Sequence, residues 1–204
     1  MLRYSHEHEI LHHQSSDHHD RRRLQKSFSF GCNLQNAVMG GGWDRVLKMR
    51  ATAEWQTARA MPKSSERTKV FRDLRVHFRL SEYDFHADVA KHRKASGRGP
   101  LVGINECQKL ASRAWISVER HLYNGGSPRF ISSRRGLHSI EGKTNRTGII
   151  WKADQQCVTV SKHVYRVRVD KHDDWLTRAL QDPTDPTKPI RVKYCRIVRE
   201  MRKG

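Results

Sequence analysis

The sequence has little of what builds a large core, a covalent framework or a membrane segment. Of its 204 residues, 36% are hydrophobic and 8% are aromatic. Its four cysteines are isolated, without a Cys-x-x-Cys pair, so their spacing indicates neither a zinc ribbon nor a disulfide framework. No apolar run approaches the ~18 residues of a membrane span, and the first residues contain no apolar stretch of signal-peptide length. We therefore expect no membrane partner and a cytoplasmic location, as for an intracellular protein of prokaryotic type.

Motifs for catalysis are also absent. The sequence contains no Gly-x-x-x-x-Gly-Lys-Ser/Thr loop, no Gly-x-Ser-x-Gly elbow and no His-Glu-x-x-His pair. Asp182 and Asp185 each precede a proline, where aspartate commonly serves a turn. Histidines at positions 6, 8, 12, 13, 18 and 19 suit transition metals, but we interpret them as part of a solvated tail. We expect no catalytic residue, no cofactor and no metal site.

Positive charge is what the chain has in excess. It carries 40 Lys and Arg against 21 Asp and Glu, a formal net charge of +19. Such a charge repels itself in the compact state unless a polyanion neutralises it, and nucleic acid is the usual polyanion. The excess is largest in residues 126–204, with 18 basic and 8 acidic side chains. The composition favours nucleic-acid binding, with an acidic protein or an anionic membrane surface as the alternatives.

The first two parts of the chain differ in composition and periodicity. Residues 1–60 are a His-rich, low-complexity segment, in which we expect a mobile tail over 1–42 and a short helix from Trp43. Residues 61–125 are a helical part, with one apolar stripe over 70–78 and a capping box at Ser81 that opens a helix through about Lys94. The clearest helix starts at Asn105 and ends at the Asn-Gly-Gly run 124–126. Its apolar face consists of Cys107, Leu110, Ala111, Ala114, Val118 and Leu122.

Residues 126–204 form a basic, β-rich domain. Ile149 and Trp151 are predicted to pair with the run 158–160, and residues 164–169 alternate as a strand does. Residues 192–199 form another predicted strand. A short helix at 175–180 and a proline turn at 182–186 separate these last two. The predicted fold class is α+β, with a helical part followed by a small antiparallel, barrel-like domain.

Two groups of side chains in this domain are candidate phosphate ligands. Arg166 and Arg168 occupy alternate positions of one predicted strand, so their side chains leave the same face. A polar segment flanked by glycines, 142–148, can approach a phosphate closely. This segment carries Lys143, Asn145 and Arg146.

Several stretches resemble the OrfB/TnpB family of insertion-sequence proteins, often labelled transposases, which are relatives of the type V CRISPR nucleases. The most specific is LHSIEGKTN at 137–145, followed by GIIW at 148–151 and preceded by PRF at 128–130. Weaker likenesses lie at 81–86, 108–114, 182–183 and 192–199. The resemblance covers roughly residues 70–199, and residues 1–60 align with nothing in the family. Ile131-Ser132 replaces the basic residue that usually follows Arg-Phe.

The resemblance implies a lobe that binds guide RNA and DNA, with a helical recognition part and a wedge-like β-barrel. In the family a RuvC-like nuclease domain with a Gly-Leu-Asp motif follows, and this sequence stops before such a motif. We therefore expect no nuclease activity from the chain alone, and a nuclease domain in trans as a further partner. The alternatives are a nuclease-less DNA-binding regulator, one half of a split enzyme, and a remnant without function. The residues expected to contact nucleic acid are Arg129, Arg134, Arg135, Lys143, Asn145, Arg146, Lys152, Arg166 and Arg168.

Overall fold

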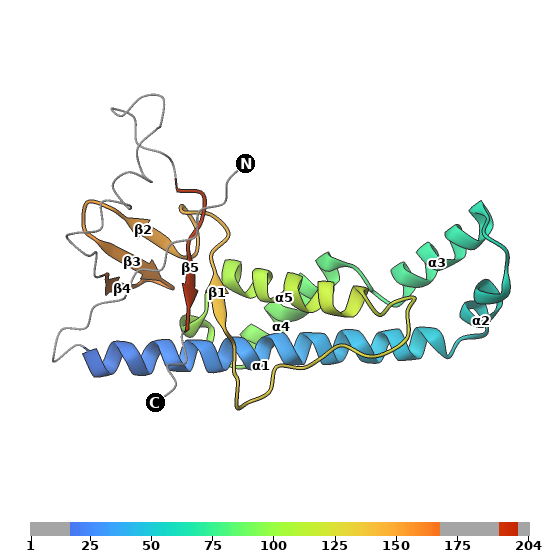
Figure 1. Cartoon of the computed structure of the whole chain (residues 1–204), viewed down its shortest axis with the longest axis horizontal. Coiled ribbons are helices and arrows are strands. Elements are labelled where there is room, and N and C mark those ends of the chain that lie inside the picture. The colour runs from blue at the N-terminus through green and yellow to red at the C-terminus, as the bar shows by residue number, and fades with distance from the viewer. Residues whose placement is uncertain (1–16, 168–191, 200–204) are drawn as a thin grey trace, which may run out of the picture. The chain divides into compact units, whose positions relative to one another are not determined.

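The computed structural model describes residues 17–167 and 192–199 (Figure 1). These residues belong to two compact units, each with a core of its own and each built from stretches that are distant in the sequence. Helices and small antiparallel sheets are both present, so the predicted α+β class is confirmed. Unit 1 draws its described residues from Met1–Phe28, Pro100–Glu106 and Leu137–Gly204, and unit 2 from Ser29–Gly99 and Cys107–Gly136.

The first element is a long helix, α1 (Asp17–Arg50), which begins in unit 1 and continues into unit 2. The prediction of a tail over residues 1–42 is therefore wrong from residue 17 onward. Apolar side chains recur at heptad-like intervals along one side of α1 and are no more than 6% exposed. The stripe is hard to detect in the sequence because glutamine and glycine occupy its positions 35 and 42, and the glycine run 40–42 is typical of a loop. The buried members of the stripe are Phe28, Cys32, Met39, Val46 and Met49.

Hydroxyl side chains cap the N-termini of the three helices that directly follow α1. Thr52, Ser64 and Ser81 each accept a hydrogen bond from the backbone amide three residues ahead. The helix start predicted at Ser81 is thus confirmed. The helices that these caps open are α2 (Ala53–Ala60), α3 (Ser65–His77) and α4 (Glu82–Ala95), and they are followed by the 3-10 turn η1 (Gly99–Leu101) and by α5 (Ile104–Glu119).

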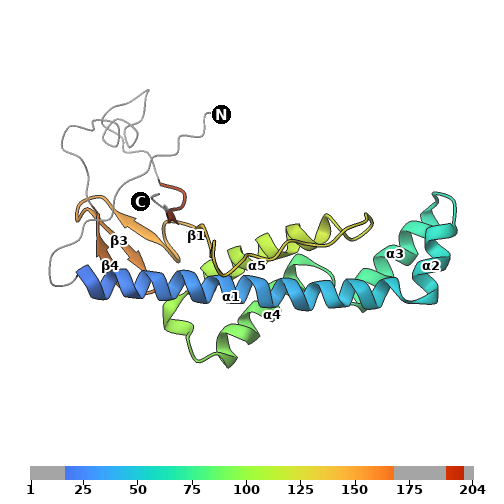
Figure 2. The same cartoon turned by 60° about the horizontal axis from the view of Figure 1, so that its bottom comes forward.

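The core of unit 2 lies between α1, α4 and α5, which run beside one another in Figures 1 and 2. Phe85 of α4 is fully buried and packs edge-on against Trp115 of α5, with ring centroids 5.3 Å apart. Its ring also meets α1 at Gly42, where a Cβ atom would lie 2.1 Å from it. The apolar face predicted for α5 is confirmed, although the helix ends at Glu119, before the predicted glycines. Each residue of that face is at most 1% exposed: Cys107, Leu110, Ala111, Ala114, Val118 and Leu122.

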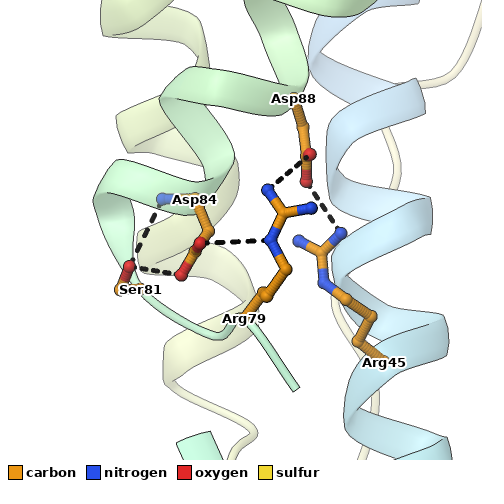
Figure 3. A network of polar contacts seen from close by, with 5 residues as sticks. All are labelled: Arg45, Arg79, Ser81, Asp84 and Asp88. Carbon is orange, nitrogen blue, oxygen red and sulfur yellow. Dashed lines mark hydrogen bonds and ion pairs between the residues drawn. The ribbon is translucent and has the colours of Figure 1, made fainter. Parts of the chain in front are cut away.

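A network of ion pairs joins α1 to α4 (Figure 3). Arg45 donates to Asp88 at 2.7 Å, and its guanidinium lies 5.3 Å from the centroid of the Phe85 ring. Arg79, just before α4, approaches Asp84 at 3.4 Å and Asp88 at 3.5 Å. One carboxylate, that of Asp88, therefore faces two arginines across the helix interface. Acidic side chains, which are scarce in this chain, are used here to hold helices together.

Two neighbouring glycines of α1 should respond in opposite directions to replacement by alanine. At Gly41 a Cβ atom meets nothing within 4 Å, so Gly41→Ala should stabilise the fold by about 0.5–1 kcal/mol through helix propensity. At Gly42 the new methyl group collides with buried Phe85, so Gly42→Ala should destabilise by about 1–3 kcal/mol. Urea denaturation followed by circular dichroism measures both changes. Equal stabilisation by the two variants would contradict the packing of α4 on α1.

Unit 1 contains two small antiparallel sheets. The first pairs β1 (Ser139–Glu141) with β5 (Arg196–Val198), and the second has the order β2 (Ile150–Lys152), β3 (Cys157–Val160), β4 (His163–Arg166). The predicted pairing of the segment around Trp151 with 158–160 is confirmed, since Trp151 lies opposite Val158. The predicted barrel is wrong for the described residues, because their strands of three or four residues form two separate sheets that do not close on one another.

Several sequence predictions fall outside the described residues. They are the short helix at 175–180, the proline turn at 182–186, and the part of the predicted strand 164–169 that includes Arg168. Over the ranges that are described, no helix is both long enough and apolar enough to cross a membrane.

Candidate nucleic-acid interface

The three-stranded sheet of unit 1 presents two cations on one face. Lys152 lies opposite Cys157, and Cys157 lies opposite Arg166, so the three residues form one row across β2, β3 and β4. Directly paired residues of an antiparallel sheet project to the same side. Lys152 and Arg166 are therefore on the same face, two strand spacings or about 10 Å apart at the backbone. Both side chains are exposed, while Cys157 between them is 4% exposed.

The next row of this outer face is uncharged. It consists of Ile150, Thr159 and Val164, and Val164 is 53% exposed. Lys152 and Arg166 thus border an uncharged patch that no acidic side chain interrupts. The alternation predicted from the sequence is confirmed over 164–167: Tyr165 and Val167 are buried, and Val164 and Arg166 face out.

The first turns of α1 lie against the inner face of the same sheet. His163 contacts the carboxylate of Asp20 at 2.6 Å, and its ring packs 4.7 Å from that of Tyr165. Tyr165 is 1% exposed, and this burial raises the pKa of its hydroxyl to about 12, with Asp20 adding to the rise and Arg23 opposing it. On the outer face the exposed side chains belong to the two edge strands, and they are those of Lys152, Val164 and Arg166.

The segment 142–148 is anchored by the side chain of Asn145. Its amide nitrogen donates to the carbonyl of Trp151 at 3.2 Å, and its amide oxygen accepts from the Trp151 N–H at 2.7 Å. The backbone N–H of Asn145 donates to the carbonyl of Lys193 at 2.8 Å. Asn145 therefore holds the loop beside β2 and uses its own polar groups to do so. Lys143 and Arg146 are exposed on the loop that Asn145 anchors.

The loop also has a tight internal turn. The Thr144 hydroxyl accepts from the backbone N–H groups of Arg146 at 3.2 Å and Thr147 at 3.1 Å. Its two glycines are explained by close packing: a Cβ at Gly142 would lie 2.9 Å from the backbone nitrogen of Ile149, and Gly148 has a φ of +94° beside the carboxylate of Glu106. The packing of Gly148 was not detectable from the sequence, because Glu106 is distant in the chain.

A second loop, in unit 2, carries the remaining predicted arginines. There the side chain of Asn36 donates to the carbonyl of Ile131 at 2.8 Å and accepts from its N–H at 3.0 Å. This is the same two-bond pairing that Asn145 makes with Trp151. Phe130, beside Ile131, lies against Gly40 of α1 and remains 51% exposed. The arginines of this loop are all exposed: Arg129, Arg134 and Arg135.

The predicted residues thus fall into two sets, one on each unit. Lys143, Asn145, Arg146, Lys152 and Arg166 share unit 1, whereas the arginines of the 129–135 loop belong to unit 2. The two-stranded sheet β1–β5 of unit 1 also contains an ion pair, in which Arg196 of β5 contacts Glu141 of β1 at 2.5 Å. Within the described part of the chain, no group of three or more His, Cys, Asp or Glu residues is placed to hold a metal ion.

Comparison with known proteins adds no relative to this description: no family model, no curated protein and no solved structure matches the chain.

Asn145 should contribute to stability more than to charge recognition. Asn145→Ala removes both hydrogen bonds to Trp151 and leaves the part-buried N–H and C=O of Trp151 without these partners. This loss should destabilise unit 1 by about 1–3 kcal/mol. Asn33→Ala, at an exposed position of α1, is the matched control and should change stability by less than about 0.5 kcal/mol. Chemical denaturation measures both. Native stability in Asn145→Ala would show that the loop does not depend on this pairing.

Proposed function

We propose that this protein binds nucleic acid through the outer face of the β2–β3–β4 sheet and the adjoining loop 142–148. The observation that carries the proposal is the row Lys152–Cys157–Arg166, which fixes two exposed cations on one face of a folded sheet. Lys143 and Arg146 extend the positive charge onto the loop that Asn145 anchors beside β2. A cationic surface on a rigid sheet is suited to following a phosphate backbone.

The electrostatics favour an anionic polymer over a bland solvated surface. The chain has a net charge of +19, and its outer-face rows contain no acidic residue to compensate Lys152 and Arg166. Long Lys and Arg side chains that approach phosphates release counterions from the polymer, which gives a binding free energy that depends steeply on salt. Val164 on the same face is 53% exposed and offers an apolar contact beside the cations. We infer that the cations contact phosphates and carry no base-specific reading.

Removing the two sheet cations should weaken binding in a salt-dependent way. In Lys152→Gln/Arg166→Gln, the slope of log affinity against log salt should flatten by about 0.7–0.9 for each lost phosphate contact. Fluorescence anisotropy with a labelled oligonucleotide at several salt concentrations measures the slope. The matched control is Arg21→Gln/Arg22→Gln, which removes two exposed cations from α1, the element that covers the opposite face of the sheet. An equal loss of affinity in both double variants would mean that binding depends only on the net charge of the chain. That result would contradict a site on this face.

The resemblance to the OrfB/TnpB family supports a finer proposal, that the nucleic acid is a guide RNA together with DNA. The most specific likeness, 137–145, includes β1 and runs into the loop that carries Lys143. If the chain binds a guide, RNA that copurifies with it from its native host should be enriched in one transcript. Sequencing of the bound RNA measures this enrichment. A broad mixture that follows cellular abundance would contradict guide binding, while leaving charge-driven binding of nucleic acid intact.

A further inference from the structure

Unit 2 has a second cationic surface that none of the predicted residues reaches. An open depression of about 890 Å³ lies at the turn between α2 and α3 and over the first two turns of α3. Four cations line it, and three hydroxyl side chains lie between them. Phe71 forms its apolar wall. The lining cations are Lys63, Arg67, Lys69 and Arg72.

The positive charge of this depression comes from side chains and not from the start of the helix. The Ser64 hydroxyl already accepts from the N–H of Arg67 at 3.2 Å, so the cap of α3 is occupied. Glu66 in the first turn is hydrogen-bonded to the Ser65 hydroxyl at 3.0 Å and places a negative charge there. Lys63 and Lys69 are exposed, and Arg72 approaches Asp73 only at 3.8 Å, with both side chains more than 60% exposed. Their charges are therefore available to an anion in solvent.

An ordered group of aromatic rings adjoins the cations. The guanidinium of Arg67 lies 5.4 Å from the centroid of Phe71, which packs edge-on against Trp55 at 4.9 Å and Tyr123 at 5.3 Å. Trp55 and Tyr123 are stacked at 5.7 Å with an interplanar angle of 14°. Trp55 is 5% exposed, whereas Tyr123 is 39% exposed. The buried tryptophan thus supports a tyrosine ring that solvent can reach.

We propose that the α2–α3 depression binds single-stranded nucleic acid, with phosphates on Lys63, Lys69 and Arg72 and a base against the Phe71–Tyr123 rings. Cations that follow a backbone beside aromatic rings are the combination that proteins use for single strands. A duplex keeps its base faces stacked inside, so only an unpaired base can use such rings. The proposal rests on the proposed function for the class of ligand, but it uses different residues on the other unit.

Charge-matched triple variants of the full chain test the site. Lys63→Gln/Lys69→Gln/Arg72→Gln removes three exposed cations of the depression, and Lys91→Gln/Lys94→Gln/Arg98→Gln removes three exposed cations at and beyond the end of α4. With a slope of ~0.7 per phosphate for single strands, each lost contact should weaken binding about fourfold at 0.15 M salt relative to a 1 M reference. We expect a loss of about fourfold to fiftyfold for a labelled 20-nucleotide oligo(dT) in the first triple and less than about twofold in the second. Equal losses would overturn the proposal.

Two further measurements on the unaltered chain locate the ligand without any substitution. Photocrosslinking with 4-thiothymidine in the same oligonucleotide, followed by peptide mass spectrometry, should give adducts at Phe71 or Tyr123; adducts confined to unit 1 would overturn the proposal. Thymidine monophosphate, added at the concentration of the oligonucleotide's phosphates, should not displace the labelled oligonucleotide. Full displacement would overturn the proposal, because it would show a site for a single nucleotide. The two proposals can fail separately. Weaker binding by Lys63→Gln/Lys69→Gln/Arg72→Gln, together with full affinity in Lys152→Gln/Arg166→Gln, would support the depression as a site and contradict the sheet face as an interface.

Discussion

Two asparagine side chains hold the loops on which the predicted cations stand. In each case a side-chain amide satisfies the backbone N–H and C=O of one residue, Trp151 of β2 or Ile131 of the 129–135 loop. Asn145 supplies both a donor and an acceptor to Trp151, and Asn36 does the same for Ile131. An asparagine amide has the same donor and acceptor as a peptide group, which is why one side chain can satisfy a whole residue. The positions of Lys143, Arg146 and the arginines at 129–135 follow from these two pairings.

The second constraint is the shortage of acidic side chains in a chain of net charge +19. Where the structure does pair charges, it does so at joints: Asp88 joins α1 to α4, Glu141 joins β1 to β5, and Asp20 joins α1 to β4 through His163. Partly buried pairs of this kind screen one another, and the exposed faces keep their positive charge. On the two cationic surfaces described above, the outer face of the sheet and the α2–α3 depression, basic side chains outnumber acidic ones.

The sequence predicted best where the signal is local. The cap at Ser81, the buried face of α5, the pairing around Trp151 and the outward position of Arg166 all depend on neighbours a few residues away. The helix α1 was missed over 17–42 because its buried stripe passes through glutamine at 35 and glycine at 42, which are unusual core residues. The barrel was wrong because alternation identifies a strand but does not say which strand it pairs with. The depression on α3 was missed because its cations look like an ordinary solvated helix face.

Sequence by itself determined the charge, the cap at Ser81, and the periodicity of the later helices and strands. The tertiary structure alone decided which polar side chains are exposed and which hold the backbone in place. Asn145 and Arg146 are adjacent in the chain, yet one amide pairs with Trp151 while the other side chain is exposed. Gly41 and Gly42 differ in the same way, since only Gly42 meets Phe85. The Gly42–Phe85 contact joins residues 43 positions apart, and the Asn36–Ile131 pairing joins residues 95 positions apart. Local sequence patterns do not encode which distant group will make such a contact.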